Sequence, residues 1–210
     1  MNRALLVIDV QESFRRLPLW EAVSAPGIAG RAARLAAAAR AAGDLVVWIL
    51  HAEPGTGGPF DPDLGHVRLM DGLDPGPGEP VLTKTSRNAF TTTGLQQLLT
   101  ARGIGEVAVC GIQTEQCCET TARLAADLGY RVTFVTDATA TFPIPHRDAP
   151  PGRSPAEILA DPATLPADQV IARTEYALAG RFAAIAALDD LAPAAPAAEA
   201  GAAAPAGGAR

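Results

Sequence analysis

Short apolar runs alternate with segments of helical spacing along most of the chain. Continuous apolar runs, which are typical of strands buried on both faces, occupy 4–8, 45–50, 81–83, 106–110 and 131–136, and a weaker run covers 182–187. Apolar spacing and stop glycines predict helices over 26–42, 95–102, 114–128 and 168–179. The alternation predicts a three-layer α/β/α fold with a six-stranded, mostly parallel sheet.

Two stretches depart from this alternation. Seven prolines fall between positions 143 and 166, and we expect a long insertion there with one helical turn near 156–159. Loops of this length in compact domains often act as lids or bind partners, and the sequence leaves both open. Positions 192–210 are nearly all Ala, Pro and Gly, which predicts a disordered tail. We therefore expect one domain over 1–191.

Polar residues or glycine close most of the predicted strands. Asp9, His51, Lys84, Gly111 and Asp137 each follow an apolar run. Because parallel strands place their carboxyl ends on one edge of the sheet, we expect all five at that edge. Open α/β folds bind their ligands there, so the sequence predicts a functional site at this edge.

Composition and charge exclude several classes of function. Hydrophobic residues make up 48% of the 210 positions, which predicts a packed globule. The net charge of −6 argues against nucleic acid or an anionic membrane surface as the main partner. No apolar run approaches the ~20 residues that span a bilayer. The first residues do not resemble a secretory signal, and we expect a cytoplasmic protein.

Cysteine and histidine usage argues against a structural metal. Cys110, Cys117 and Cys118 form a poor disulfide framework and lack a zinc-binding spacing. The irregular stretch 53–80 contains Asp61, Asp63 and His66, whose side chains could bind a divalent ion. Their spacing is loose, so we favour a solvated loop and predict neither a metal nor another cofactor.

The thiol of Cys117 stands where proteins often place a nucleophile. It follows a buried strand and begins a predicted helix with Thr114 as its N-cap, so the helix N-terminus and the Lys84 ammonium could lower its pKa. Asp9 could accept the thiol proton, and backbone N–H groups of Gln113 and Cys117 could bind an oxyanion. This set describes acyl transfer to water. The alternative is that Cys117 is a small buried hydrophobe, as we expect for Cys110 and Cys118.

Three sequence blocks carry a resemblance to a known family. The first, LLVIDVQESF, contains Asp9, Gln11 and Phe14, and the second, KTSRNAF, contains Lys84 and Phe90. The third, CGIQTEQCCETTARLAADLGYRVTFVTDATATF, opens a helix with a G-hydrophobic-x-T-acidic-x-Cys run. All three in this order resemble the isochorismatase-like cysteine hydrolase family, from about position 4 to 191.

The resemblance implies a site and a chemistry. It implies an Asp9–Lys84–Cys117 triad and a non-proline cis peptide between Ile112 and Gln113 near the oxyanion site. Members of the family carry a six-stranded parallel sheet and usually form dimers or tetramers, so a homodimer or homotetramer is expected. Their substrates are mostly small molecules with an amide, carbamoyl or ureido C–N bond.

The chain also departs from the family pattern. Cys118 stands where Val is usual. The nicotinamidase branch has an Asp-x-His metal pattern after its second strand, where this chain reads His51-Ala52-Glu53. The insertion 143–166 is longer than usual, so no member's substrate is carried over. Candidate substrate-binding residues are Gln11, Phe14, Trp20, His51, Arg87, Phe90, Gln116 and Phe142.

Several alternatives stay open from the sequence. Phe14 and Trp20 are either pocket walls or ordinary packing, and packing is favoured. His51 either contacts substrate or closes its strand. An isochorismate-type hydrolase of a vinyl ether would use Asp9 and Lys84 without covalent chemistry. A non-catalytic redox sensor is the third class, because adjacent low-pKa thiols oxidise readily.

Overall fold

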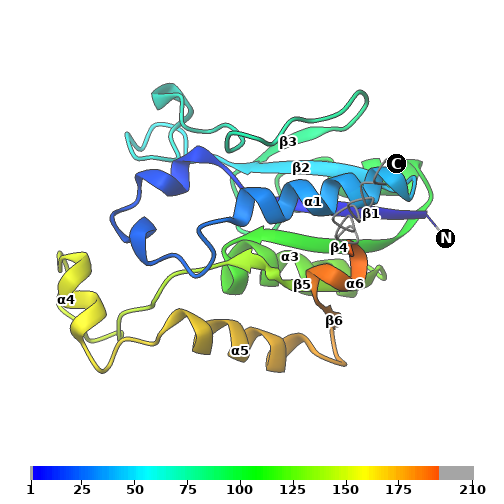
Figure 1. The fold of residues 1–210 in the computed structure, drawn as a ribbon. Helices are drawn as coiled ribbons and strands as arrows, with labels where there is room; N and C mark the ends of the chain where they lie inside the picture. The colour runs from blue at the N-terminus through cyan, green and yellow to red at the C-terminus, as the bar shows by residue number, and fades with distance from the viewer. Residues whose placement is uncertain (1, 194–210) are drawn as a thin grey trace, which may run out of the picture.

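Six parallel strands form one sheet in the computed structural model, which describes residues 2–193. They are β1 (Asn2–Ile8), β2 (Leu45–His51), β3 (Val81–Lys84), β4 (Ile104–Ile112), β5 (Arg131–Ala140) and β6 (Ala184–Ala186). Their order across the sheet is β3-β2-β1-β4-β5-β6, and every neighbouring pair is parallel. The predicted fold class is confirmed. Figure 1 shows the carboxyl ends of β1 and β2 facing the side that carries the loop after β1 and α4.

Helices cover both faces of the sheet (Figure 1). They are α1 (Ile28–Ala41), α2 (Leu95–Ala101), α3 (Glu119–Asp127), α4 (Pro155–Ala160), α5 (Ala167–Leu178) and α6 (Leu188–Leu191). One core holds buried residues of α1 and α6, and the other holds buried residues of α2, α3 and α5. The apolar positions of α1 recur at helical spacing, so Ile28 and Leu35 share its buried face.

Shorter turns complete the connections. They are η1 (Glu12–Arg16), η2 (Pro18–Ala22), η3 (Pro62–Leu64) and the π-helical turn η4 (Thr114–Cys118). Within the proline-rich insertion, Ser154 and Glu157 form a capping box that starts α4, in agreement with the predicted helical turn. α5 begins after Pro166, and Asp168 lies in its first turn rather than capping it. Among the described residues, no helix combines the length and apolarity that crossing a membrane requires.

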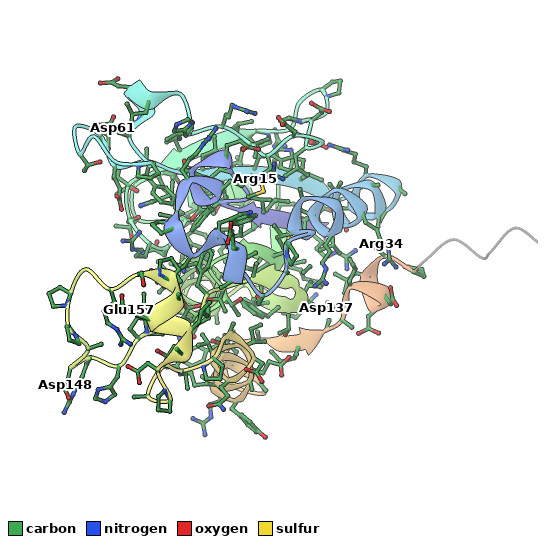
Figure 2. The ribbon with its side chains drawn as sticks, turned by 60° about the vertical axis from the view of Figure 1, so that its left-hand side comes forward. Arg15, Arg34, Asp61, Asp137, Asp148 and Glu157 are labelled. Carbon is green, nitrogen blue, oxygen red and sulfur yellow. The ribbon has the colours of Figure 1, made fainter. Side chains whose placement is uncertain are left out.

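The end of β5 differs from the prediction. The strand continues past Asp137 to Ala140, because its pairing with β4 shifts register between Val109 and Gly111. Asp137 therefore lies within the strand, and its carboxylate accepts a 2.6 Å hydrogen bond from the backbone N–H of Leu188. Figure 2 places Asp137 toward the orange segment of β6 and α6. The expectation that Asp137 joins the other polar residues at the site was wrong.

β4 also continues through the glycine that was predicted to form a turn. Gly111 has φ +129°, and a Cβ atom built on it would lie 1.9 Å from the carbonyl oxygen of Ile8. No side chain fits at that distance, so only glycine allows β4 to approach the end of β1 this closely. Ile8 immediately precedes Asp9, so this contact fixes the place where the first site residue leaves the sheet.

Replacing Gly111 with alanine is expected to destabilise the protein by at least about 2 kcal/mol, because the added methyl group meets rigid backbone. The free energy of unfolding in urea would measure the loss. Gly129→Ala is the matched control, because Gly129 has φ +90° but open space around a built Cβ. Equal losses in the two variants would show that backbone strain alone, and not the close approach to Ile8, requires glycine at 111.

The predicted tail falls largely outside the described part of the chain. Positions 194–210 lie beyond it, and their predicted disorder stays a prediction. Ala192 is buried, and its carbonyl accepts a hydrogen bond from Arg34 of α1.

Candidate active site

Asp9 leaves the sheet in a conformation that is rare for a residue with a side chain. Its φ is +54°, and its carboxylate is fully buried. The backbone is held by hydrogen bonds from Asp9 N–H to Ile49 O and from Gln11 N–H to Asp9 O, both 2.8 Å long. A left-handed conformation outside glycine costs about 1–3 kcal/mol and persists where surrounding contacts enforce it. The end of β1 is therefore built to hold a carboxylate at this point.

Lys84 supplies the charge opposite Asp9. It is the last residue of β3, and its side chain is completely buried. Its Nζ lies 2.7 Å from Asp9 Oδ2, 3.4 Å from Cys117 Sγ and 3.4 Å from His51 Nδ1. An ammonium group has three hydrogens, and these three atoms supply three acceptors. The structure thus brings together Asp9, Lys84 and Cys117, and adds His51 as a fourth contact.

Cys117 lies in a π-helical turn rather than in the first turn of a regular helix. The carbonyl of Gln113 accepts hydrogen bonds from the N–H groups of Gln116 and Cys118, at 3.2 and 3.1 Å. Gln113 is the N-cap residue, and the predicted cap, Thr114, instead donates to Thr139 Oγ1 at 2.8 Å. The prediction for Thr114 was wrong because a buried threonine on β5 binds its hydroxyl. Single π turns inside helices are frequent at functional sites.

The segment before this turn carries an N–H group suited to an oxyanion. The peptide bond between Ile112 and Gln113 is cis, at the position that the resemblance implies. Within the described residues, the N–H of Gln113 has no hydrogen-bond acceptor. Gln113 and Cys117 lie at the two ends of one turn, so this N–H donor lies on the same turn as the Cys117 thiol.

The acid–base properties of the triad differ from the expectation. Burial raises the pKa of the Cys117 thiol to about 12, the negative charge of Asp9 adds to the increase, and Lys84 opposes it. The predicted lowering of this pKa was wrong, because the loss of solvation outweighs the nearby ammonium. Burial also raises the pKa of Asp9, and Lys84 offsets part of that increase. Before substrate binds, the sulfur therefore keeps its proton.

The remaining oxygen of Asp9 faces no ordinary donor. Asp9 Oδ1 is buried and has no hydrogen-bond partner among the described residues, while the Cys117 thiol is close enough to act on the Asp9 pKa as a hydrogen-bond donor. A weak S–H donor satisfies a carboxylate poorly, which leaves this oxygen ready to accept a proton. The carboxylate is thus held by Lys84 through one oxygen and can act as a base through the other.

The other two cysteines belong to the packed interior. Cys110 and Cys118 are fully buried, in agreement with the packing interpretation. Burial raises the pKa of Cys110 to about 12 and that of Cys118 well above its ordinary value. Neither thiol is accessible to a substrate.

Gln11 holds the strand end next to the triad instead of facing a ligand. Its Oε1 accepts from the backbone N–H of His51 at 2.7 Å, and its Nε2 donates to His51 O at 3.0 Å and to Ser13 Oγ at 2.9 Å. The amide is fully buried with both ends occupied. These bonds tie the end of β2 to the turn after β1, so the structure supports a structural role for Gln11 in place of the predicted contact with substrate.

The predicted aromatic residues divide into two groups. Phe14 stacks on Phe142 and Trp20 packs edge-on against Phe142, with ring centroids 6.3 Å apart in both pairs. Phe90 instead stacks on Tyr130 and packs in the core of α2 and α3. The structure therefore supports a packing role for Phe90 in place of the predicted contact with substrate.

A pocket of about 420 Å³ borders the turn that carries Cys117. It is lined by Leu17, Pro18, Leu19, Gln113, Glu115, Gln116, Phe142, Pro143, Ile144, Pro145, Arg153, Pro155 and Ile158. Three predicted site residues, Gln113, Gln116 and Phe142, line it, whereas Phe14 and Trp20 pack against Phe142. Figure 2 shows this face of the molecule, with Arg15 on the loop after β1 and Glu157 on α4. The proline-rich insertion therefore forms one wall.

Sequence reasoning missed the individual residues of that wall. The apolar Leu-Pro-Leu run at 17–19 is a signal for a pocket wall in an otherwise irregular loop. Arg153 and Ile158 lie in the flagged insertion, where no periodicity reveals which side chains face inward. A second hollow of about 470 Å³ includes Arg31, Asp137 and Glu175. No triad residue lines either hollow, but the first is lined by Gln113 and Gln116 from the turn that carries Cys117, whereas the second has no residue of that turn.

The acidic loop after β2 does not assemble a metal site. Asp61 caps η3: its carboxylate accepts hydrogen bonds from the N–H groups of Gly57 at 2.8 Å and Asp63 at 3.2 Å. These bonds lower the pKa of Asp61. Among the described residues, no three His, Cys, Asp or Glu side chains gather as metal ligands would.

Comparison with known proteins decides the family. The model of the isochorismatase domain family matches residues 3–150 of this chain. The chain belongs to the isochorismatase family. The match ends inside the proline-rich insertion, so α4 and α5 lie beyond the matched residues.

Relatives from the family are similar over much of the chain. Streptothricin hydrolase of Streptomyces noursei is 43% identical over 147 residues, which cover 68% of this chain and 51% of that protein. The chain thus spans about half the length of this relative. Ureidoacrylate amidohydrolase RutB of Methylorubrum extorquens is 31% identical over 181 residues, covering 70% of this chain and 71% of its own.

Solved structures from the family share the fold. A hydrolase of the isochorismatase family from Chromobacterium violaceum superposes with a TM-score of 0.78 at 28% identity, covering 91% of this chain and 93% of its own. Because it covers 91% of this chain, the structural similarity extends beyond the residues that the family domain matches. The fold of this chain is therefore shared with solved members of the family.

Proposed function

We propose that this chain is a cysteine hydrolase that cleaves a C–N bond in a small molecule carrying an amide, carbamoyl or ureido group. One observation carries the proposal: a buried Lys84 ammonium lies within 3.4 Å of both the Asp9 carboxylate and the Cys117 sulfur. Burying three ionisable groups together is costly, and such clusters concentrate at functional sites. Two similar proteins, a streptothricin hydrolase and a ureidoacrylate amidohydrolase, are both hydrolases, and the second acts as an amidohydrolase, which supports the same chemistry.

In the first half of the reaction, Asp9 accepts the thiol proton of Cys117. The sulfur attacks the carbonyl carbon, and the carbonyl oxygen becomes an oxyanion that the free N–H of Gln113 can bind. One such donor contributes roughly 3 kcal/mol. Asp9 then gives its proton to the leaving nitrogen, the C–N bond breaks, and an amine or ammonia departs from a thioester on Cys117.

In the second half, water takes the place of the leaving amine. Asp9 accepts a proton from the water, and the resulting hydroxide attacks the thioester carbonyl. The C–S bond breaks, and the proton on Asp9 returns to the sulfur. Lys84 keeps Asp9 oriented and its charge balanced throughout. Burial raises the pKa of the Asp9 carboxyl group, and the raised pKa suits this group to both giving and accepting a proton.

The pocket beside the turn indicates the shape of the substrate. Nine of its thirteen residues are leucine, isoleucine, proline or phenylalanine, and its volume of about 420 Å³ exceeds what a single amide group fills. We therefore propose a substrate with an apolar body next to the scissile bond. Assembly as a homodimer or homotetramer and a cytoplasmic location stay predictions.

Two other functions have less support. An isochorismate-type hydrolase would not need a thiol in contact with Lys84. A redox sensor would not need a carboxylate beside its thiol, whereas Cys117 shares the Lys84 ammonium with the Asp9 carboxylate. Both alternatives are separated by the experiment below.

Ammonia release from a panel of amides, carbamates and ureides is expected for at least one compound with an apolar body. Stopping the reaction with acid should trap a thioester on the peptide that contains Cys117, detectable as a mass increase equal to the acyl group. Protein alkylated at Cys117 with iodoacetamide is the control and should release no ammonia. Full activity of the alkylated protein would contradict the thiol mechanism, and pyruvate release from isochorismate by that protein would favour the vinyl-ether alternative.

A further inference from the structure

The triad is connected to the protein surface through a histidine. His51 is the last residue of β2, and its ring is buried between Lys84 on one side and two exposed charged residues on the other. Its Nδ1 lies 3.4 Å from Lys84 Nζ. Its Nε2 lies 3.2 Å from Glu53 Oε1 and 3.1 Å from Arg87 Nη1. The side chains of Glu53 and Arg87 are 38% and 55% exposed and form an ion pair at 3.6 Å.

The ammonium group of Lys84 decides which ring nitrogen carries the proton. With a proton on Nδ1, the His51 N–H and the Lys84 ammonium would be two donors facing each other at 3.4 Å. The Lys84 side chain is fully buried, so it could not bond to bulk water instead. With the proton on Nε2, Nδ1 accepts from Lys84 and Nε2 donates to Glu53. Arg87 then has no acceptor on the ring, but it is exposed and can bind Glu53 and water. The second tautomer costs less because only an exposed group loses a partner.

In this tautomer, all three hydrogens of the Lys84 ammonium have acceptors. Asp9 Oδ2 and Cys117 Sγ take two, and His51 Nδ1 takes the third. The first two acceptors belong to the reaction, because Asp9 and Cys117 exchange a proton. The histidine is the only one of the three that does not change during that exchange, so it can keep the ammonium pointed at the sulfur while the other two alternate in charge.

The backbone of His51 is fixed as firmly as its ring. Gln11 bonds both its N–H and its carbonyl oxygen, and the ring packs edge-on against Phe60 at a centroid distance of 5.7 Å. A residue that merely closed its strand would not need its side chain oriented at both nitrogens. This arrangement matches the way an imidazole is held when its tautomer matters to a neighbouring group.

We infer that His51 is a positioning residue: its neutral ring, with the proton on Nε2 and bonded to Glu53, orients the Lys84 ammonium toward Cys117. This inference rests on the proposed cysteine hydrolase function and deepens it, because it connects the reactivity of Cys117 to an ion pair on the surface. Protonation of the ring would place an imidazolium against the ammonium and would remove the third acceptor. Reactivity of the sulfur should therefore fall at acid pH.

The charged groups facing the ring set where that fall occurs. Burial and the charge of Lys84 lower the pKa of His51, the hydrogen bond to Glu53 and the charge of Asp9 raise it, and Arg87 lowers it. Removing Glu53 should lower the pKa of His51 further, so the acid limb moves to lower pH. Removing Arg87 should raise that pKa, so the limb moves to higher pH. Two substitutions on one ion pair are thus expected to shift the profile in opposite directions.

Alkylation of Cys117 by iodoacetamide tests this without a known substrate. The rate, measured against pH by mass spectrometry, should fall about 10- to 100-fold in His51→Leu, because the ammonium is no longer held. His51→Asn should recover most of the rate, because its side-chain oxygen can stand in for Nδ1. Glu53→Gln and Arg87→Gln should move the acid limb down and up in pH, respectively. His146→Leu is the matched control, since that ring is half exposed, bonds only near Asp148 and touches no triad residue.

The outcomes separate the inference from the proposed function. Once a substrate is found, His51→Leu should lower kcat with little change in KM. An unchanged alkylation rate in His51→Leu, equal losses in the Leu and Asn variants, or shifts of the same sign for Glu53→Gln and Arg87→Gln would overturn the inference. If the alkylation profile behaves as expected but no compound is hydrolysed, the proposed function fails and the positioning role of His51 stands.

Discussion

Replacing Cys117 with alanine is expected to lower the rate of hydrolysis by about 10⁴-fold or more, because no thioester can form. The remaining groups, Asp9 and Lys84, would still bind and polarise substrate, so KM should change far less than kcat. The measurement is ammonia release with the best compound of the panel. The variant should remain folded, since the loss of one buried sulfur costs on the order of 1 kcal/mol.

The neighbouring cysteine offers a matched control for this variant. Cys118→Ala makes the same substitution one position along, at a fully buried residue without a hydrogen bond to the triad. It should lose a similar amount of stability and keep most of the activity. Comparable activity losses in the two variants would indicate that packing in the turn, rather than the thiol of Cys117, determines the rate.

Replacing Lys84 with methionine is expected to destabilise the protein by about 3–5 kcal/mol and to lower kcat by about 10²- to 10⁴-fold. The substitution leaves the Asp9 carboxylate buried without its cation. Burial then raises the pKa of Asp9 without the opposing effect of Lys84, so the carboxylate takes up a proton. Protonated Asp9 cannot accept the thiol proton. Urea unfolding and ammonia release measure the two effects.

A double variant separates the charge pair from the shape of the site. Asparagine suits position 9, because it tolerates the positive φ of 54° better than most residues. In Asp9→Asn/Lys84→Met neither charge is left alone, so the loss of stability should be clearly smaller than the sum of the two single losses. Additive losses would show that Asp9 and Lys84 are not energetically coupled, and would remove the main support for the triad.

Sequence patterns predicted the sheet and the meeting of Asp9 and Lys84 at its edge because both depend on local, periodic signals. The apolar runs before Asp9 and Lys84 place these residues at strand ends, and parallel strands bring such ends to one edge. Asp137 failed this argument because β5 continues through a shift in register that no local pattern reveals. The residue after an apolar run therefore lies at the sheet edge only where the pairing of that strand stops with the run.

The finer features of the site depend on contacts between distant segments. Nothing near Gln11 in the sequence indicates that its amide binds the backbone at His51, 40 positions away. The pKa of Cys117 depends on burial beneath several elements, and burial cannot be judged from a helix start alone. The walls of the pocket also come from two irregular segments, the loop after β1 and the proline-rich insertion, where side-chain direction follows no period.

The central position of β1 in the sheet has a consequence for how the protein is made. β1 pairs with β2 and β4, and its partner residues in β4 begin at Ile104. At a synthesis rate of about 5–20 residues per second, the first strand waits several seconds for its second neighbour. Until then one edge of β1 is unpaired, and Asp9 is not yet in contact with Cys117. We expect chaperone binding during synthesis to concentrate on this first strand.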